Sequence, residues 1–260
     1  MLEKWGIKVP RGGRKERTVY VWVPDSAEED GDARYPVLYM FDGHNVFLDE
    51  DATYGKSWGL GDYLEESGTE LIVVGIDCDH RANYARLKEY SPFDFSEEEF
   101  GEIKGRGRDF MRFMTRQLKP LIDERYPTIP DREATFIAGS SMGGLMSLYA
   151  VTAYNRYFSR AAALSPSVWV SLSGLEDVIR SSRLAPDTVV YMDYGERELA
   201  NHPHMIEGFW QTATALCQRG VNLTARIVPG GDHSEASWER QLPIVMPTLL
   251  YEQPEPDGGD

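Results

Sequence analysis

The segment Gly139-Ser140-Ser141-Met142-Gly143 sets a serine between two glycines in a G-x-S-x-G pattern. Apolar patterning predicts a buried strand over 135–138 just before it and a helix from Leu145 just after it. A strand, a sharp turn and a helix in this order form a nucleophile elbow, where flanking glycines let the two backbones approach. Ser141 is therefore the candidate nucleophile for an acyl-transfer reaction.

A serine hydroxyl needs a base to remove its proton and a third group to orient that base. His233 follows the strand predicted over 223–228 and precedes the last predicted helix. Ligands of open α/β sheets bind at the carboxyl ends of the strands, so this position suits a catalytic histidine. We therefore expect His233 to be the base.

The remaining histidines fit this role less well. His44 and His80 lie in earlier loops, and His202 and His204 flank a proline. A metal site built from His202, His204 and Glu207 would lack the i, i+4 helical pairing of a zinc site. We therefore assign no metal ligand.

The acid of a triad should follow the strand predicted over 188–192. Three carboxylates stand there, Asp193, Glu196 and Glu198, in the segment DYGERELA. Spacing does not choose among them, and at least one is expected to be a solvated surface charge.

An oxyanion hole requires two backbone N–H groups. One is expected from Met142, the residue after the nucleophile. The other is expected from the loop after the strand predicted over 37–40, where Gly43 lets the main chain turn inward. The second donor is thus the amide of Gly43 or His44.

The elements that must position these residues alternate along the chain, which indicates an α/β fold with a mostly parallel central sheet and helices on both faces. Strands are predicted over 18–23, 37–40, 71–76, 135–138, 161–164, 188–192 and 223–228, and helices over 108–125, 145–153, 203–219 and 235–250. Pro120 is expected to kink or split the first of these helices.

The chain lacks internal repeats and Gly/Ser linkers, so residues 1–251 are expected to form a single domain. The tail 252–260 is rich in charge, Pro and Gly and is expected to be disordered. The stretch 77–107 has no clear pattern, and a connection of that length is usually functional or contains small elements of its own.

Composition excludes several classes of protein. Among 260 residues, 27 Lys and Arg against 42 Asp and Glu give a net charge of −15, which disfavours nucleic-acid and membrane-surface partners. No segment resembles a signal peptide or a membrane span, which predicts a cytoplasmic protein. Cys78 and Cys217 are too few for a disulfide framework, and both are expected to be buried.

Several segments together resemble an esterase family of α/β-hydrolases that includes enterochelin esterases, S-formylglutathione hydrolase (esterase D), carbohydrate acetyl and feruloyl esterases, and mycolyltransferases. The segments are PVLYMFDGHNVF (36–47), RLKEYSP (86–92), FIAGSSMGG (136–144), ALSPSVWV (163–170), MDYGERE (192–198) and GGDHSEASW (230–238). Two departures stand out: the family often reads DGQN where this chain has His44, and only one tryptophan, Trp169, follows LSPS.

The resemblance implies an α/β-hydrolase fold with Ser141 as nucleophile and His233 as base. The G-x-x-[DE] segment of the family falls on 195–198, so Glu198 becomes the preferred acid. The resemblance further implies that Trp169, Trp58 and the loop beginning at Arg86 line the substrate pocket.

The expected function is hydrolysis of a small-molecule carboxylic ester through an acyl-enzyme on Ser141, without a cofactor. Two alternatives stay open: an acyltransferase that uses the same acyl-enzyme, and a non-catalytic binding protein with the same fold. The sequence does not name the acyl or alcohol part of the substrate. It also leaves open whether the protein forms a homo-oligomer.

Overall fold

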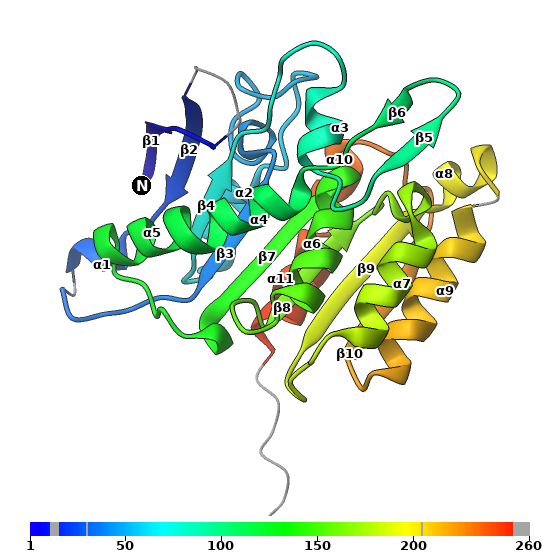
Figure 1. Cartoon of the computed structure of the whole chain (residues 1–260). Coiled ribbons are helices and arrows are strands. Elements are labelled where there is room, and N and C mark those ends of the chain that lie inside the picture. The colour runs from blue at the N-terminus through cyan, green and yellow to red at the C-terminus, as the bar shows by residue number, and fades with distance from the viewer. Residues whose placement is uncertain (11–15, 30, 204, 252–260) are drawn as a thin grey trace, which may run out of the picture.

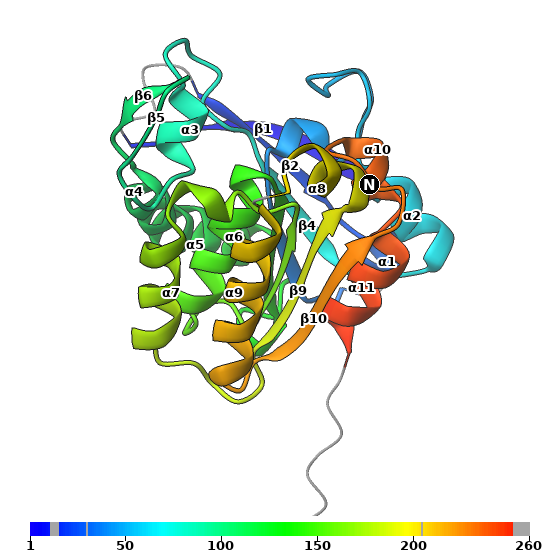
Figure 2. The same cartoon turned by 90° about the vertical axis from the view of Figure 1, so that its right-hand side faces the viewer.

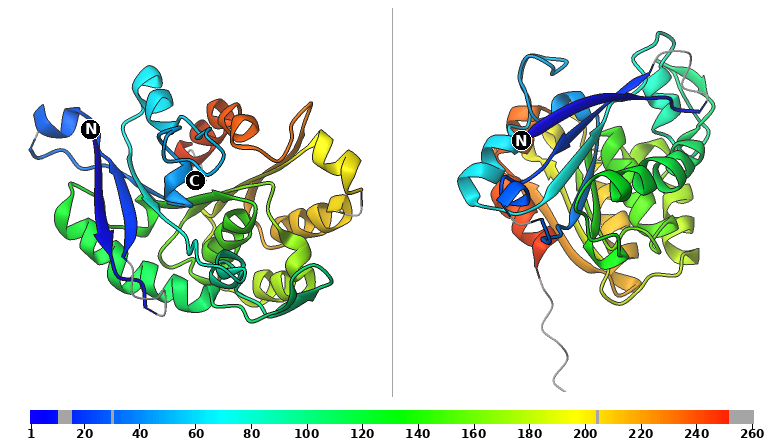
Figure 3. Two further views of the ribbon diagram at one scale, coloured as in Figure 1. Left: turned by 90° about the horizontal axis from the view of Figure 1, so that it is seen from above. Right: turned by 90° about the vertical axis from the view of Figure 1, so that its left-hand side faces the viewer.

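The computed structural model describes residues 1–10, 16–29, 31–203 and 205–251. Its centre is an eight-stranded sheet in the order β1-β2-β4-β3-β7-β8-β9-β10 (Figure 1). The strands are β1 (Leu2–Ile7), β2 (Arg17–Trp22), β3 (Val37–Phe41), β4 (Ile72–Ile76), β7 (Thr135–Ser140), β8 (Arg160–Leu164), β9 (Val189–Gly195) and β10 (Asn222–Val228). From β4 to β10 every pairing is parallel, whereas β1 and β2 are antiparallel at one edge (Figure 3), so the predicted mostly parallel sheet is confirmed.

Helices cover both faces of this sheet. Figure 2 shows α4 (Gly107–Phe113), α5 (Lys119–Arg125), α6 (Met142–Ala153), α7 (Leu172–Ser181) and α9 (Met205–Gln218) on one side, and α2 (Leu60–Ser67), α10 (Glu235–Glu239) and α11 (Leu242–Leu250) on the other. Shorter elements are α1 (Ser26–Glu29), η1 (Gly43–Asn45), α3 (Ala85–Glu89), η3 (Arg132–Ala134), η4 (Val168–Val170) and α8 (Glu196–Asn201).

Successive side chains of the central strands point alternately into two apolar cores, one on each face of the sheet. In β3, Val37, Tyr39 and Phe41 pack into the core beneath α4 to α7 and α9, whereas Leu38 and Met40 pack into the core beneath α2 and α11. Successive side chains of a strand point to opposite faces, so a strand covered on both faces must be apolar at every position. This explains the continuous apolar runs in the sequence.

The expected helix over 108–125 is interrupted just before Pro120. The π-helical segment η2 (Met114–Leu118) separates α4 from α5, and Pro120 occupies the first turn of α5. Proline lacks an amide donor and clashes with the preceding turn, so it is best tolerated in the first turn of a helix. The last predicted helix is likewise divided, into α10 and α11.

The long stretch 77–107 contains elements of its own, as expected. These are α3 and a small hairpin of β5 (Phe95–Glu97) with β6 (Gly101–Ile103). In Figure 1 the hairpin lies at the end of the sheet where the parallel strands finish, together with α8 and α10. The elements β1, α2 and α7 were not predicted from the sequence.

Two other expectations concern single features. Cys78 is buried, but the expectation for Cys217 was wrong, because it lies on an exposed position of α9. No helix within the described ranges is long and apolar enough to cross a membrane. The tail 252–260 lies outside the described residues, and the cytoplasmic location stays a prediction.

Candidate active site

Ser141 occupies the sharp turn between β7 and α6. Its backbone has φ 58° and ψ −122°, a conformation that non-glycine residues rarely adopt. A Cβ atom on Gly139 would lie 2.9 Å from the carbonyl carbon of Gly143, so only glycine permits the strand and the helix to approach this closely. The local geometry is that of a nucleophile elbow.

His233 lies in the loop between β10 and α10, and Glu198 lies on α8, which follows β9. The Nδ1 atom of His233 is 2.6 Å from Oε2 of Glu198. Glu198 is buried, whereas the His233 side chain is 48% exposed. An imidazole held by a carboxylate at Nδ1 has its other nitrogen left for the nucleophile, and His233 and Ser141 line the same cavities.

The Glu198 carboxylate is held by further donors. The hydroxyl of Ser165 donates to Oε1 at 2.6 Å, and the amide of Gly195 donates to the same oxygen at 2.9 Å. Burial by itself raises the pKa of the Glu198 carboxyl, but hydrogen bonds with His233 and Ser165 outweigh it and hold the pKa below its usual value. The carboxylate therefore stays ionised beside the imidazole.

The other two candidate acids lie elsewhere. Asp193 belongs to β9 rather than to the loop expected after the strand, and its carboxylate accepts a hydrogen bond from Tyr191 Oη at 2.7 Å. Glu196 accepts from the amide of Gly230 at 2.9 Å. Of the three carboxylates, the structure brings only that of Glu198 to His233.

The residues expected to form the oxyanion hole lie at the same end of the sheet. Met142 begins α6, so its amide is at a helix N-terminus. Gly43 and His44 begin η1, directly after β3, which pairs with β7. The loop is held in place by Asp42, whose carboxylate accepts two hydrogen bonds from the Arg86 guanidinium, at 2.8 and 2.6 Å. The donor role of these amides stays a prediction.

Two cavities meet at Ser141 and His233. The first, named here the Trp169 cavity, has a volume of about 390 Å³ and includes Trp169, Tyr194 and Met205 in its wall. The second, named the His44 cavity, has a volume of about 240 Å³ and is lined by His44, His80, Arg86 and other polar side chains. Larger hollows lie away from Ser141, beside β1 and beside α3.

The residues that the resemblance assigned to the pocket are placed differently from one another. Trp169 lines its cavity and packs against Phe95 of the β5–β6 hairpin, with ring centroids 6.0 Å apart. Arg86 lines the His44 cavity. Trp58 is only 3% exposed and is absent from the described lining of both cavities. It packs behind Trp238, which does reach the His44 cavity.

Two residues that contact the candidate triad, Trp238 and Ser165, were missed from the sequence. The Trp238 ring meets the His233 ring edge-on, with ring centroids 5.1 Å apart. The indole N–H of Trp238 donates to Ser165 Oγ at 3.1 Å. Ser165 thus joins Trp238 to Glu198. Its φ of 45° is unusual for serine, and its place after β8 in the LSPS segment was the only signal in the sequence.

Of the residues weighed earlier as a metal site, only His202 and Glu207 are among those that the structure describes. His202 lines the Trp169 cavity, and Glu207 on α9 accepts a hydrogen bond from Gln211 at 3.0 Å. His204 lies outside the described residues.

Comparison with solved structures identifies the fold. The siderophore hydrolase EstB from Aspergillus nidulans superposes with a TM-score of 0.70 at 18% identity, covering 98% of this chain and 97% of that one. The parallel sheet flanked by helices, with a serine on a strand-to-helix turn, is that of an α/β-hydrolase.

Sequence comparison defines the family. The family model described as "Putative esterase" matches residues 13–249, and the chain belongs to this family. The protein is a carboxylic ester hydrolase. The Bacillus subtilis protein YbbA is 25% identical over 249 residues, 92% of this chain and 94% of YbbA. The ferri-bacillibactin esterase BesA of Bacillus subtilis is 25% identical over 174 residues, 62% of this chain and 58% of BesA.

Proposed function

We propose that the protein hydrolyses small-molecule carboxylic esters through an acyl-enzyme on Ser141. The observation that carries this proposal is the 2.6 Å contact of His233 with Glu198 beside a serine in a strained elbow. An oriented imidazole that lines the same cavities as a half-buried serine is the arrangement that activates serine as a nucleophile.

In the proposed reaction, Ser141 Oγ attacks the acyl carbon while His233 accepts the hydroxyl proton. The negative charge that forms on the carbonyl oxygen is stabilised by the amide of Met142 and an amide of the Gly43–His44 turn. Collapse of this intermediate breaks the bond to the alcohol oxygen, and His233 returns its proton to the leaving alkoxide. Water then attacks the acyl-enzyme by the same steps and releases the acid.

We further propose that the substrate spans both cavities, because Ser141 and His233 belong to the walls of each. An aromatic or aliphatic part suits the side of Trp169, and a polar part suits the side of His44 and Arg86. The names of BesA and EstB support siderophore esters as the first class to test.

A fluorophosphonate probe tests the mechanism, since it modifies only an activated serine. We expect mass spectrometry to find the label on Ser141 and expect labelling to abolish ester hydrolysis in proportion. A label on Ser140, or full hydrolysis by a labelled protein, would overturn the assignment. An unlabelled, inactive protein would indicate a binding protein of the same fold.

A substrate panel then tests the substrate class. Siderophore, feruloyl, acetyl-sugar and short acyl esters are compared at equal concentration, with and without added alcohols. We expect free acid as the product under all conditions and the highest kcat/KM for a siderophore ester. If acyl groups pass to the added alcohol in preference to water, the protein is an acyltransferase instead.

A further inference from the structure

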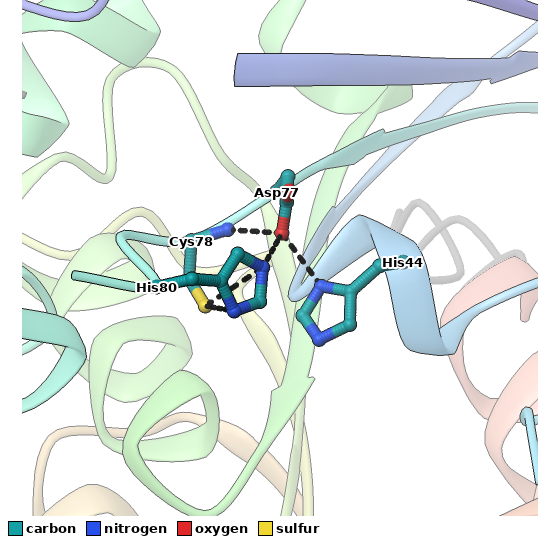
Figure 4. Close-up of side chains that lie close together, drawn as sticks. All are labelled: His44, Asp77, Cys78 and His80. Carbon is teal, nitrogen blue, oxygen red and sulfur yellow. Dashed lines mark hydrogen bonds and ion pairs between the residues drawn. The ribbon is translucent and has the colours of Figure 1, made fainter. Parts of the chain in front are cut away.

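Four side chains with metal-ligating atoms meet beside the candidate active site: His44, Asp77, Cys78 and His80 (Figure 4). One ligating atom from each lies within 4.8 Å of all the others. Asp77 Oδ1 is 2.7 Å from His44 Nδ1 and 2.6 Å from His80 Nε2, and Cys78 Sγ is 3.9 Å from the His80 ring nitrogens. No spacing in the sequence indicates this cluster, because His44 comes from a different loop.

The fold explains why the two loops meet. His44 follows β3, and the other three residues follow β4, its parallel neighbour, so both loops leave the same edge of the sheet. Gly43 and Gly75 pack backbone against backbone, which draws η1 onto the end of β4. The position of the cluster is therefore set by the sheet itself.

The second loop is also anchored beyond the cluster. The amide of Asp79 donates to the Glu89 carboxylate at 2.8 Å, and the Asp79 carboxylate is 3.2 Å from the Arg17 guanidinium. These groups are buried. The backbone that carries Asp77 and Cys78 is thus fixed, whereas His80, whose side chain is 54% exposed, can adjust.

We propose that these four side chains form a binding site for a divalent transition-metal ion, with zinc the best match. Two imidazoles, a thiolate and a carboxylate are a donor set that zinc accepts and that calcium and magnesium do not. Tetrahedral zinc places neighbouring ligand atoms about 3.3–3.7 Å apart. The two Asp77 contacts are shorter than this range and the Cys78–His80 contact is slightly longer. Binding an ion therefore requires a small movement of His80 and a rotation of the Asp77 carboxylate away from His44.

The charges of the cluster also suit a divalent ion. A thiolate on Cys78, formed when the thiol proton passes to solvent, and the Asp77 carboxylate together balance two positive charges. Cys78 and His44 are both buried, so a bound ion would be shielded from water on one side and open to the His44 cavity on the other. The alternative is a purely hydrogen-bonded network in which Asp77 only orients the two histidines.

Cobalt binding distinguishes the two cases, because Co²⁺ takes zinc sites and a thiolate ligand gives it a charge-transfer absorption. The full chain is stripped with a chelator and titrated with Co²⁺ and then with Zn²⁺. We expect one Co²⁺ per chain with the thiolate absorption, and its stoichiometric loss on adding Zn²⁺. A chain without this absorption would overturn the proposal.

Three variants locate the site. Cys78→Ser should remove the thiolate absorption, and His80→Ala should weaken Co²⁺ binding at least ~10-fold. Cys217→Ser is the matched control, since that cysteine is exposed on α9. It should leave the thiolate absorption and the affinity for Co²⁺ unchanged. The proposal fails if the absorption depends on Cys217 or if His80→Ala binds Co²⁺ as tightly as the parent. Should Cys78→Ser not fold, the half-exposed His80 still decides the outcome.

Discussion

Gly43 and Gly75 lie so close that a Cβ atom on Gly75 would be 2.8 Å from the Cα atom of Gly43. Gly75 lies within β4, and Gly43 belongs to the turn that is expected to stabilise the oxyanion. The missing side chains therefore set how deeply this turn sits against the sheet. A methyl group at Gly75 would push the turn away without itself entering either cavity.

We predict that Gly75→Ala lowers both stability and activity. Overpacking of a tight site costs about 1–3 kcal/mol, and a displaced oxyanion donor should reduce kcat about tenfold or more. Thermal melts and ester kinetics measure the two effects. Gly31→Ala is the control, because nothing lies within 4 Å of a Cβ there. Equal melting temperatures and equal kcat values for the two variants would show that the close approach of Gly43 and Gly75 matters for neither stability nor activity.

Ser141→Ala should reduce kcat by at least ~10³-fold while leaving the melting temperature almost unchanged, because only the attacking hydroxyl is removed. Ser140→Ala is the natural comparison. Ser140 is the neighbouring residue at the end of β7, is buried, and lines the His44 cavity. Its loss should change kcat by less than about tenfold. The reverse ranking would place the nucleophile one residue earlier.

Glu198→Gln should lower kcat by at least ~10²-fold, because an amide keeps the shape of the carboxylate but favours the wrong imidazole tautomer. Glu196→Gln is matched to it in chemistry and lies on the same helix, and it should stay within about tenfold of the parent. Steady-state kinetics at one pH measure both. An active Glu198→Gln enzyme would mean that another group orients His233.

Ser165→Ala removes the hydroxyl that donates to Glu198 at 2.6 Å and accepts from Trp238 at 3.1 Å. With one donor fewer, the pKa of Glu198 rises towards its usual value, since that hydrogen bond favours the ionised carboxyl. We therefore expect kcat to fall about tenfold with KM unchanged, because the carboxylate that orients His233 is held by fewer donors. A lower melting temperature with unchanged kcat would indicate a packing role only.

Asp193 should make stability depend on pH. Burial raises its pKa to about 7 in the folded chain, against ~3.9 when unfolded. Between these values the native state binds more protons than the unfolded state, so stability falls as pH rises. The asparagine of Asp193→Asn cannot ionise. The melting temperature of this variant should therefore fall less between pH 5 and pH 8 than that of the parent.

Relative to its value at pH 5, the melting temperature of Asp193→Asn at pH 8 should therefore exceed that of the parent by a few degrees. Each kcal/mol of stability is worth about 2–4 °C in a chain of this size. Asp177→Asn serves as the control, because that side chain is 79% exposed on α7. Parallel pH curves for the parent and Asp193→Asn would show that the carboxyl is ionised throughout.

Local sequence determined most of the fold and part of the site. The apolar runs of β3, β7 and β9 follow from burial on both faces, and the glycines around Ser141 follow from one close approach of strand and helix. Each of these features is encoded within a few consecutive residues. The alternating order of elements then places the serine and His233 at the same end of a parallel sheet.

Other features depended on which segments the folded chain brings together. Asp193, Glu196 and Glu198 are equivalent by spacing, and only the way α8 follows β9 turns Glu198 towards His233. Trp238 reaches the His44 cavity where Trp58 was expected to line the pocket, because Trp58 packs behind Trp238 against the core. The cluster of His44 with residues 77–80 likewise exists only because β3 and β4 are neighbours, a long-range pairing that no short stretch of sequence contains.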